Sequence, residues 1–286
     1  MTIFGVKTMY KIGINYATAD YIAKKTNTPT LTVLKDLKLN GISTLDVLYD
    51  DIKNTNVYSN ALCANLSINS CYSLVDISEL DNYSSCLEMI DYCALKRINH
   101  IMILPKVDKG VQNYLFNVKH NLKKIVNYAK TLGIKISIEN YGLNEPFCSI
   151  DGVYDVLKSV KGLGLVYDSA NFYLSKQDPY LAIQKLLPYV SRVHLKDRGA
   201  KIDGDTLAFL DIDGALSSVY PLGEGVCQLD KIIDYLLKNS KIDEFVLEGI
   251  TDTDMISDTF DSVIYLKTRI SEYENKWNSW TFTRRA

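Results

Sequence analysis

Hydrophobic and polar positions along the chain follow two different periods. The clearest helical stretch places apolar residues every three or four positions, at Val118, Leu122, Ile125, Ala129 and Leu132. Gly133 follows, a residue type common just past a helix, so this pattern predicts a helix that ends there. Other stretches are apolar runs of about four to eight residues, which are typical of buried strands.

The two patterns extend over most of the chain. Strands are expected at residues 11–16, 44–49, 61–68, 100–105, 134–140, 163–168, 191–195 and 245–249. Helices are expected from residue 20 and at 29–40, 87–98, 118–132, 153–160, 183–190, 229–237 and 258–273. Residues 51–60 are expected to form a loop and residues 199–228 the longest irregular segment, whereas residues 69–83 have no clear pattern.

Strands and helices therefore alternate, with eight strands in all. Alternation predicts a parallel sheet, and eight units favour closure into an α/β (β/α)8 TIM barrel over an open doubly wound sheet. The chain contains neither G-x-G-x-x-G nor G-x-x-x-x-G-K-[ST], which weakens dinucleotide-binding and P-loop alternatives. No linker rich in proline, glycine or serine interrupts the 286 residues, so one barrel domain over residues 1–286 is the simplest interpretation.

Four of the expected strands end in a side chain that can bind a metal ion: Glu139, Asp168, His194 and Glu248. The C-terminal strand ends of a parallel barrel converge on one face, where barrel enzymes have their active sites. One such residue alone is more often a helix cap or an ion-pair partner. Their joint recurrence inside apolar runs, where an unpaired charge is costly, points to a single site. Three carboxylates and an imidazole suit Mn²⁺, Mg²⁺, Co²⁺ or Zn²⁺.

Composition narrows the class of protein. The chain is 47% hydrophobic and 23% charged with a formal net charge of −2, so neither nucleic acid nor an anionic membrane is expected as a partner. Six cysteines occur without a C-x-x-C pair and are expected to be reduced packing residues. We find no signal-peptide pattern and no run of about 18 apolar residues, and we therefore expect a cytoplasmic protein.

Five short motifs resemble those of a known family. They are I-E-N at 138–140, Y-D-S-A-N at 167–171, V-H-L-K-D at 193–197, L-G-E-G at 222–225 and L-E-G at 247–249. In these motifs the chain resembles the sugar phosphate isomerase/epimerase family, which has a xylose isomerase-like barrel. That family includes ketose 3-epimerases, hydroxypyruvate isomerase and inosose dehydratase. The resemblance is strongest from about residue 118 to residue 250.

The resemblance implies a function as well as a fold. Glu139, Asp168, His194 and Glu248 correspond to the family's ligands for one divalent metal ion, with Mn²⁺ favoured, and the two glutamates to its acid/base pair. A metal ion that chelates the carbonyl and a neighbouring hydroxyl of a sugar stabilises the cis-enediolate formed when the α proton leaves. Two glutamates acting on opposite faces give the epimer, whereas one carboxylate acting between adjacent carbons gives the aldose or ketose isomer. The expected substrate is a small sugar or sugar phosphate.

Four further residues are candidates for substrate binding. Asn171 stands where the family often has a histidine; it can form hydrogen bonds but cannot titrate, which argues against ketose 3-epimerase activity proper. Lys196 and Arg198 are suited to binding an oxyanion or phosphate, and equally to forming a salt-bridged rim. Lys106 is a candidate of the same kind. His100, by contrast, opens its strand and is expected to be structural.

Several alternatives stay open. A metal-dependent dehydratase of a keto-polyol begins with the same abstraction of an α proton, and a barrel that binds sugar without catalysis is a further alternative. An apurinic-site endonuclease with three zinc ions would need more than the three histidines present. Trp277, Trp280 and Phe282 are suited to packing on the barrel or on a neighbouring subunit, so a homo-oligomer is also compatible with the sequence.

Overall fold

The computed structural model describes residues 10–249, 251 and 255–283, with side chains up to residue 275 except that of Thr55. Eight parallel strands form a closed barrel in the order β1, β11, β7, β6, β5, β4, β3, β2. They are β1 (Lys11–Asn15), β2 (Thr44–Leu48), β3 (Ser67–Asp76), β4 (His100–Lys106), β5 (Lys135–Glu139), β6 (Gly164–Asp168), β7 (Val190–Leu195) and β11 (Glu244–Leu247). The expected (β/α)8 TIM barrel is confirmed.

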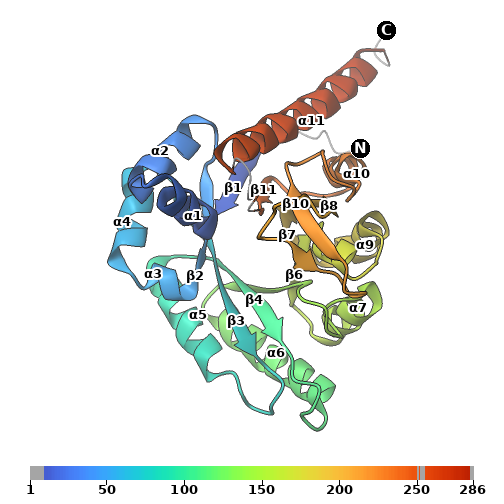
Figure 1. The fold of residues 1–286 in the computed structure, drawn as a ribbon. Coiled ribbons are helices and arrows are strands. Elements are labelled where there is room, and N and C mark those ends of the chain that lie inside the picture. Colours follow the sequence, from blue (N-terminus) through green and yellow to red (C-terminus); the bar gives the residue numbers. More distant parts are fainter. Residues whose placement is uncertain (1–9, 250, 252–254, 284–286) are drawn as a thin grey trace.

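Helices surround the barrel and follow the strands around the ring in chain order (Figure 1). They are α1 (Tyr16–Thr26), α2 (Thr30–Leu39), α3 (Tyr49–Ile52), α4 (Thr55–Cys63), α5 (Ser84–Lys96), α6 (Tyr114–Thr131), α7 (Ile150–Ser159), α8 (Asn171–Leu174), α9 (Pro179–Leu186), α10 (Leu229–Asn239) and α11 (Met255–Thr283). The long helices bury their apolar stripes against the strands; α6 buries Val118, Leu122, Ile125 and Ala129. No helix in the described part of the chain is long and apolar enough to cross a membrane.

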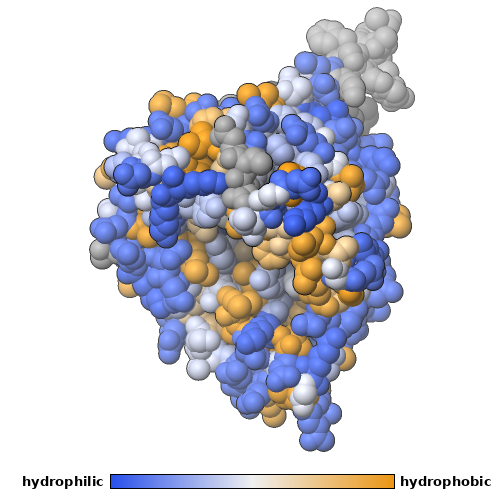
Figure 2. All heavy atoms as spheres, viewed as in Figure 1, coloured by the Kyte–Doolittle hydropathy of each residue, from blue (hydrophilic) through white to orange (hydrophobic). Residues whose placement is uncertain are grey.

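Apolar and polar residues lie in different parts of the molecule. In the view of Figure 2, hydrophilic residues cover most of the periphery, and apolar residues gather nearer the centre of the face. The main core lies between the strands and the helices, and a smaller apolar cluster contains Tyr72, Met102 and Val166. Polar groups buried within the barrel must consequently find partners among themselves.

His100 lies in one such polar layer, at the start of β4. Its ring nitrogens Nδ1 and Nε2 lie 2.8 Å from Ser70 Oγ and 2.9 Å from Ser137 Oγ. The Ser137 hydroxyl in turn lies 2.6 Å from Ser191 Oγ. A Cβ atom on Gly164 would lie only 2.6 Å from Ser137 Oγ, so the layer has no spare room. His100 is therefore a buried structural residue at the N-terminal end of the strands, as its position in the sequence predicted.

The segment 51–68 differs from the expected loop and strand. Residues 55–63 form α4, and Asn54 caps this helix because its side-chain oxygen accepts a hydrogen bond from the Asn56 N–H at 3.0 Å. Ala61 and Ala64 are buried whereas Leu62 is 63% exposed, so the burial follows a helical period rather than the alternation read from the sequence. The third barrel strand lies further on, mostly in the stretch that had no clear pattern.

The segment 199–228 also has more structure than expected. It contributes to a three-stranded antiparallel sheet of β8 (Asp197–Ala200), β9 (Phe209–Leu210) and β10 (Leu216–Tyr220), with β10 in the middle. These strands are short, and β9 is exposed, so neither a long apolar run nor a period of two marks them in the sequence. The sheet follows directly after β7 and so lies beside the C-terminal end of the barrel.

Several helix boundaries differ from the sequence pattern. α1 begins at Tyr16 rather than near residue 20, and α9 ends at Leu186, after which a 3₁₀ turn leads into β7. The last helix, α11, runs from Met255 to Thr283, and its C-terminal part projects from the barrel (Figure 1). The side chains on which the expectation of a homo-oligomer contact rested lie outside the described residues: Trp277, Trp280 and Phe282.

The buried imidazole of His100 should make stability depend on pH. Burial, together with the nearby Arg192 charge, lowers the pKa of His100 to about 3. The unfolded chain takes up this proton near pH 6.5, whereas the folded chain does not until about pH 3, so falling pH favours unfolding. Between pH 7 and pH 5 this residue should remove about 2 kcal/mol from the free energy of unfolding. Urea denaturation at both pH values measures the change.

The matched variant is His100→Gln, whose amide can still contact both serines but does not titrate. The drop in unfolding free energy between pH 7 and pH 5 should be smaller in the variant by about 2 kcal/mol. Equal pH dependence in the two proteins would show that His100 has the same pKa in the folded protein as in the unfolded chain.

Candidate metal centre

The four metal-binding candidates lie on adjacent strands at the C-terminal end of the barrel. Glu139 and Asp168 end β5 and β6, His194 is the last residue but one of β7, and Glu248 follows β11 directly. Asp168 and His194 are paired across β6 and β7. One ligand atom from each of the four residues lies within 4.8 Å of the ligand atoms of the other three.

His194 is at the centre of this cluster and contacts carboxylates through both ring nitrogens. Its Nδ1 lies 3.1 Å from Glu139 Oε1 and in a hydrogen bond with Glu248 Oε2, and its Nε2 lies 3.0 Å from Asp46 Oδ2. Burial disfavours the charged imidazole, but the three carboxylates outweigh burial and raise the pKa of His194 well above its ordinary value. These contacts favour the imidazole that carries a proton on both nitrogens.

The two glutamates of the cluster have different environments. Burial, reinforced by the charge of Glu248, raises the pKa of Glu139 to about 7. Burial acts in the same direction on Glu248, but Lys196 and His194 outweigh it and lower the pKa of that carboxyl. Two carboxylates so close together cannot both ionise freely, and the one that contacts more cations keeps its charge.

Lys196 completes the cluster. Its Nζ lies 2.9 Å from Asp168 Oδ2 and 2.9 Å from Glu248 Oε1. Burial disfavours the ammonium, but Asp168 and Glu248 reverse this effect and raise the pKa of Lys196. Lys196, one of the residues expected to bind substrate, thus lies against two of the metal-binding candidates rather than at an outer rim.

The residues fit a divalent ion. Glu139 Oε1 and Asp168 Oδ2 are buried and accept no hydrogen bond, although each lies near a cationic side chain. Ligand atoms about 2.0–2.2 Å from one ion lie no more than about 4.4 Å apart. The four ligand atoms here lie within 4.8 Å of one another, so the cluster is close to the size that one ion needs. Metal binding requires a neutral imidazole, and the carboxylate of Asp46 can then accept the Nε2–H while Nδ1 faces the cluster.

Comparison with known proteins identifies the fold family. The profile of the xylose isomerase-like TIM barrel family matches residues 43–262. The chain belongs to this family. The resemblance seen in the five sequence motifs is thereby confirmed. No curated protein sequence matches the chain.

Solved structures of similar fold have different stated activities. An L-ribulose 3-epimerase has a TM-score of 0.71 and 14% identity, with 94% of this chain and 97% of that chain covered. A probable 3-DHS dehydratase of petrobactin synthesis from Bacillus anthracis has a TM-score of 0.70, 15% identity and coverages of 90% and 98%. A xylose isomerase-like TIM barrel protein from Mycobacterium smegmatis, in complex with magnesium, has a TM-score of 0.68, 16% identity and coverages of 95% and 99%. Identities this low show the shared fold alone.

Three other residues were expected to bind substrate, and only some of them lie near the cluster. Asn171 opens α8 close to the cluster: its backbone N–H donates to Asp168 Oδ1 at 2.8 Å, and its Nδ2 is buried without a partner. Arg198 is buried in β8, where one guanidinium nitrogen donates to the carbonyl of Ser217 at 3.1 Å. Lys106 ends β4 with an exposed side chain, and the contacts of the described residues do not bring it to the cluster.

Three charged residues of the barrel interior were missed by the sequence analysis. Arg192 donates to Asp46 through Nε at 2.9 Å and through Nη2, and it donates to Glu244 through Nη1 at 2.9 Å. Asp46 thereby links Arg192 to His194. The signal was present, because Asp46 lies inside the apolar strand T-L-D-V-L and Arg192 lies two residues before His194, on the same face of β7.

The segment after β7 is attached to the barrel through Asp197. The carboxylate of Asp197 accepts hydrogen bonds from the backbone N–H groups of Gly223, Gly225 and Cys227 at 3.0 to 3.1 Å. This explains the L-G-E-G turn, since a Cβ atom on Gly225 would lie 2.3 Å from Asp197 Oδ1. The segment 221–228 is therefore held beside the strand end that carries His194.

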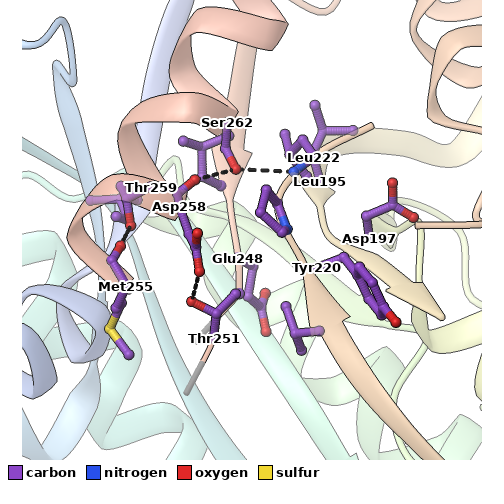
Figure 3. Close-up of a pocket in the computed structure, with 15 residues that line it drawn as sticks. Leu195, Asp197, Tyr220, Leu222, Glu248, Thr251, Met255, Asp258, Thr259 and Ser262 are labelled. Atoms are coloured by element: carbon purple, nitrogen blue, oxygen red, sulfur yellow. Dashed lines mark hydrogen bonds between the residues drawn. The ribbon is translucent and has the colours of Figure 1, made fainter. Parts of the chain in front are cut away.

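A small cavity of about 30 Å³ lies next to Glu248. In Figure 3, Glu248 lies between Thr251 and Tyr220, and the first turns of α11 close one side of the space. Such a volume has room for about two water molecules. The described residues thus leave a solvent-sized space on one side of the Glu248 carboxylate.

Asp46 should control the affinity of this centre for metal. The Asp46→Asn variant removes the charge that orients His194 through Nε2, and the affinity for Mn²⁺ should fall about 10- to 100-fold. Isothermal titration calorimetry measures the affinity. The control is Glu244→Gln, which also removes a carboxylate partner of Arg192 but does not contact His194. Equal losses in the two variants would mean that the network acts on folding rather than on the metal ligand.

Proposed function

We propose that this chain is a divalent-metal-dependent isomerase or epimerase of a small sugar or sugar phosphate. The observation that carries the proposal is that Glu139 and Glu248 both face Nδ1 of His194, although they come from different strands. In the barrel order, β5 and β11 flank β6 and β7, so the two carboxylates approach one point from two sides. Carboxylates on two sides of a substrate carbon suit removal of a proton from one face and return of a proton to the other.

Each residue then has a distinct part in the reaction. Glu139, Asp168, His194 and Glu248 would hold the ion, whose chemistry when bound is to polarise the substrate carbonyl and so acidify the adjacent C–H. Glu139 and Glu248 take and return the proton at that carbon. Asn171, whose Nδ2 has no partner in the structure, is available to donate a hydrogen bond to a substrate hydroxyl.

A dehydration of a keto-polyol is the second candidate. It begins with the same abstraction of an α proton but also needs an acid for the departing hydroxyl group. The ammonium of Lys196, 2.9 Å from Glu248 Oε1, would donate a hydrogen bond to the departing hydroxyl group close to the base. The fold that the probable 3-DHS dehydratase shares with this chain supports this candidate as well.

Deuterium uptake next to the carbonyl tests the reaction. The protein loaded with Mn²⁺ or Mg²⁺ should exchange that hydrogen in D₂O with at least one member of a panel of ketoses, their phosphates, inososes and keto acids. Either Glu139→Gln or Glu248→Gln should slow the exchange by about 10²- to 10⁴-fold, because each removes one acid/base group. Proton NMR follows the exchange and shows whether the product is an epimer, an isomer or a dehydrated compound.

The control is Glu88→Gln, which removes an exposed glutamate on α5 and should leave the rate unchanged. The metal content of every variant is measured alongside, so that loss of a ligand is not mistaken for loss of a base. Exchange that persists in both glutamate variants, or the absence of exchange with metal bound across the panel, would contradict the proposed reaction.

A further inference from the structure

Arg198 is a buried cation without a carboxylate partner. Its side chain belongs to a residue only 3% exposed, its Nη1 donates to the Ser217 carbonyl, and its Nε has no hydrogen-bond partner. Among the described residues it forms no ion pair, whereas the other buried arginine of the barrel, Arg192, contacts two carboxylates. Burying an unpaired guanidinium is costly, so such a group is typically kept for a ligand.

The position of Arg198 connects it to the candidate metal centre. Lys196 points to Asp168 and Glu248, whereas the next residue, Asp197, points the other way to the 223–227 backbone. Side chains of an extended chain alternate, which directs Arg198 to the same side as Lys196. Burial lowers the pKa of Arg198, and Asp168, Cys227, Glu248 and Asp205 partly offset this effect. The alternation therefore places Arg198 on the side that carries Lys196 and the candidate metal centre.

The free part of the guanidinium has a definite shape. The ring of Phe209 covers one face, with its centroid 4.9 Å from Cζ. Nη1 is occupied by Ser217, which leaves the edge that carries the Nε–H and an Nη2–H. Two parallel N–H groups on one edge match the two oxygens of a carboxylate. A phosphate dianion, in contrast, usually needs several donors around it.

We propose that the substrate carries a carboxylate group, which binds the free edge of Arg198 while its carbonyl end lies at the metal centre. This inference rests on the proposed function and makes the substrate a polyhydroxy keto acid rather than a neutral ketose. Of the two nitrogens on this edge, only Nε is among the fully buried atoms without a partner, so the carboxylate reaches the edge from the Nη2 side.

Three ligands with one carbon skeleton test the proposal: D-fructose, D-fructuronate and D-fructose 6-phosphate. They differ at carbon 6 alone, which carries a hydroxyl, a carboxylate or a phosphate ester. Calorimetry on the Mg²⁺-loaded protein should give an affinity for fructuronate at least about tenfold higher than for the other two. In the NMR spectrum, the Nε–H signal of Arg198 should shift on addition of fructuronate and remain in place with fructose.

Two variants identify the residue responsible. Arg198→Gln should lower the affinity for fructuronate to that for fructose, and Arg198→Lys should recover only part of it, because lysine lacks the planar fork. Lys201→Gln removes an exposed positive charge from the same segment and should change nothing. Similar affinities for all three ligands, tighter binding of the phosphate, no detectable binding of fructuronate, or a preference that survives in Arg198→Gln would each overturn the proposal.

These experiments can refute the proposed reaction and the proposed carboxylate site independently of each other. A carboxylate preference that depends on Arg198, without deuterium exchange on any substrate, would refute the proposed reaction and leave the carboxylate site standing. Exchange with neutral ketoses, without any preference for fructuronate, would refute the carboxylate site alone.

Discussion

Charged side chains inside the barrel are stabilised by direct contact with charges of opposite sign, and the arrangement of the interior follows from this requirement. The connected residues are Glu244, Arg192, Asp46, His194, Glu139, Glu248, Lys196 and Asp168. Each of them contacts at least one opposite charge. Because a buried charge without a partner costs several kcal/mol, removal of one member would leave its neighbours unpaired, and the strands that carry them must keep their register.

This network joins the two ends of the barrel, which have different properties. The N-terminal end holds the neutral His100, which contacts two serines, and the ion pair of Arg192 with Glu244. At the C-terminal end carboxylates predominate, and Glu139 and Asp168 each keep an oxygen without a hydrogen bond. These two oxygens lie against the cationic side chains of His194 and Lys196 instead. A divalent ion would replace those cations as the partner of the carboxylates.

Arg198 is the exception to this mutual neutralisation, and the small sheet beside the barrel explains how it arises. Asp197 uses its carboxylate on three backbone N–H groups of the following turn, so it is not available as a partner for the adjacent arginine. The strand β8 then carries Arg198 under the ring of Phe209. Asp197 thus holds the following turn, and Arg198 has no carboxylate partner among the described residues.

The sequence by itself determined the fold and the four residues that converge, because helical periods and short apolar runs are local and parallel strand ends must meet on one face. It failed at residues 51–68, where small residues such as Ala61 and Ala64 fit a helix and a strand equally well, and at residues 199–228, where the strands are short. Only the tertiary structure decided the partners of the charges. Arg192 and Asp46 are separated by 146 positions, and no local pattern states which buried carboxylate a guanidinium will meet. The partner is set by closure of the barrel, which brings the side chains of Asp46 on β2 and Arg192 on β7 together in the interior.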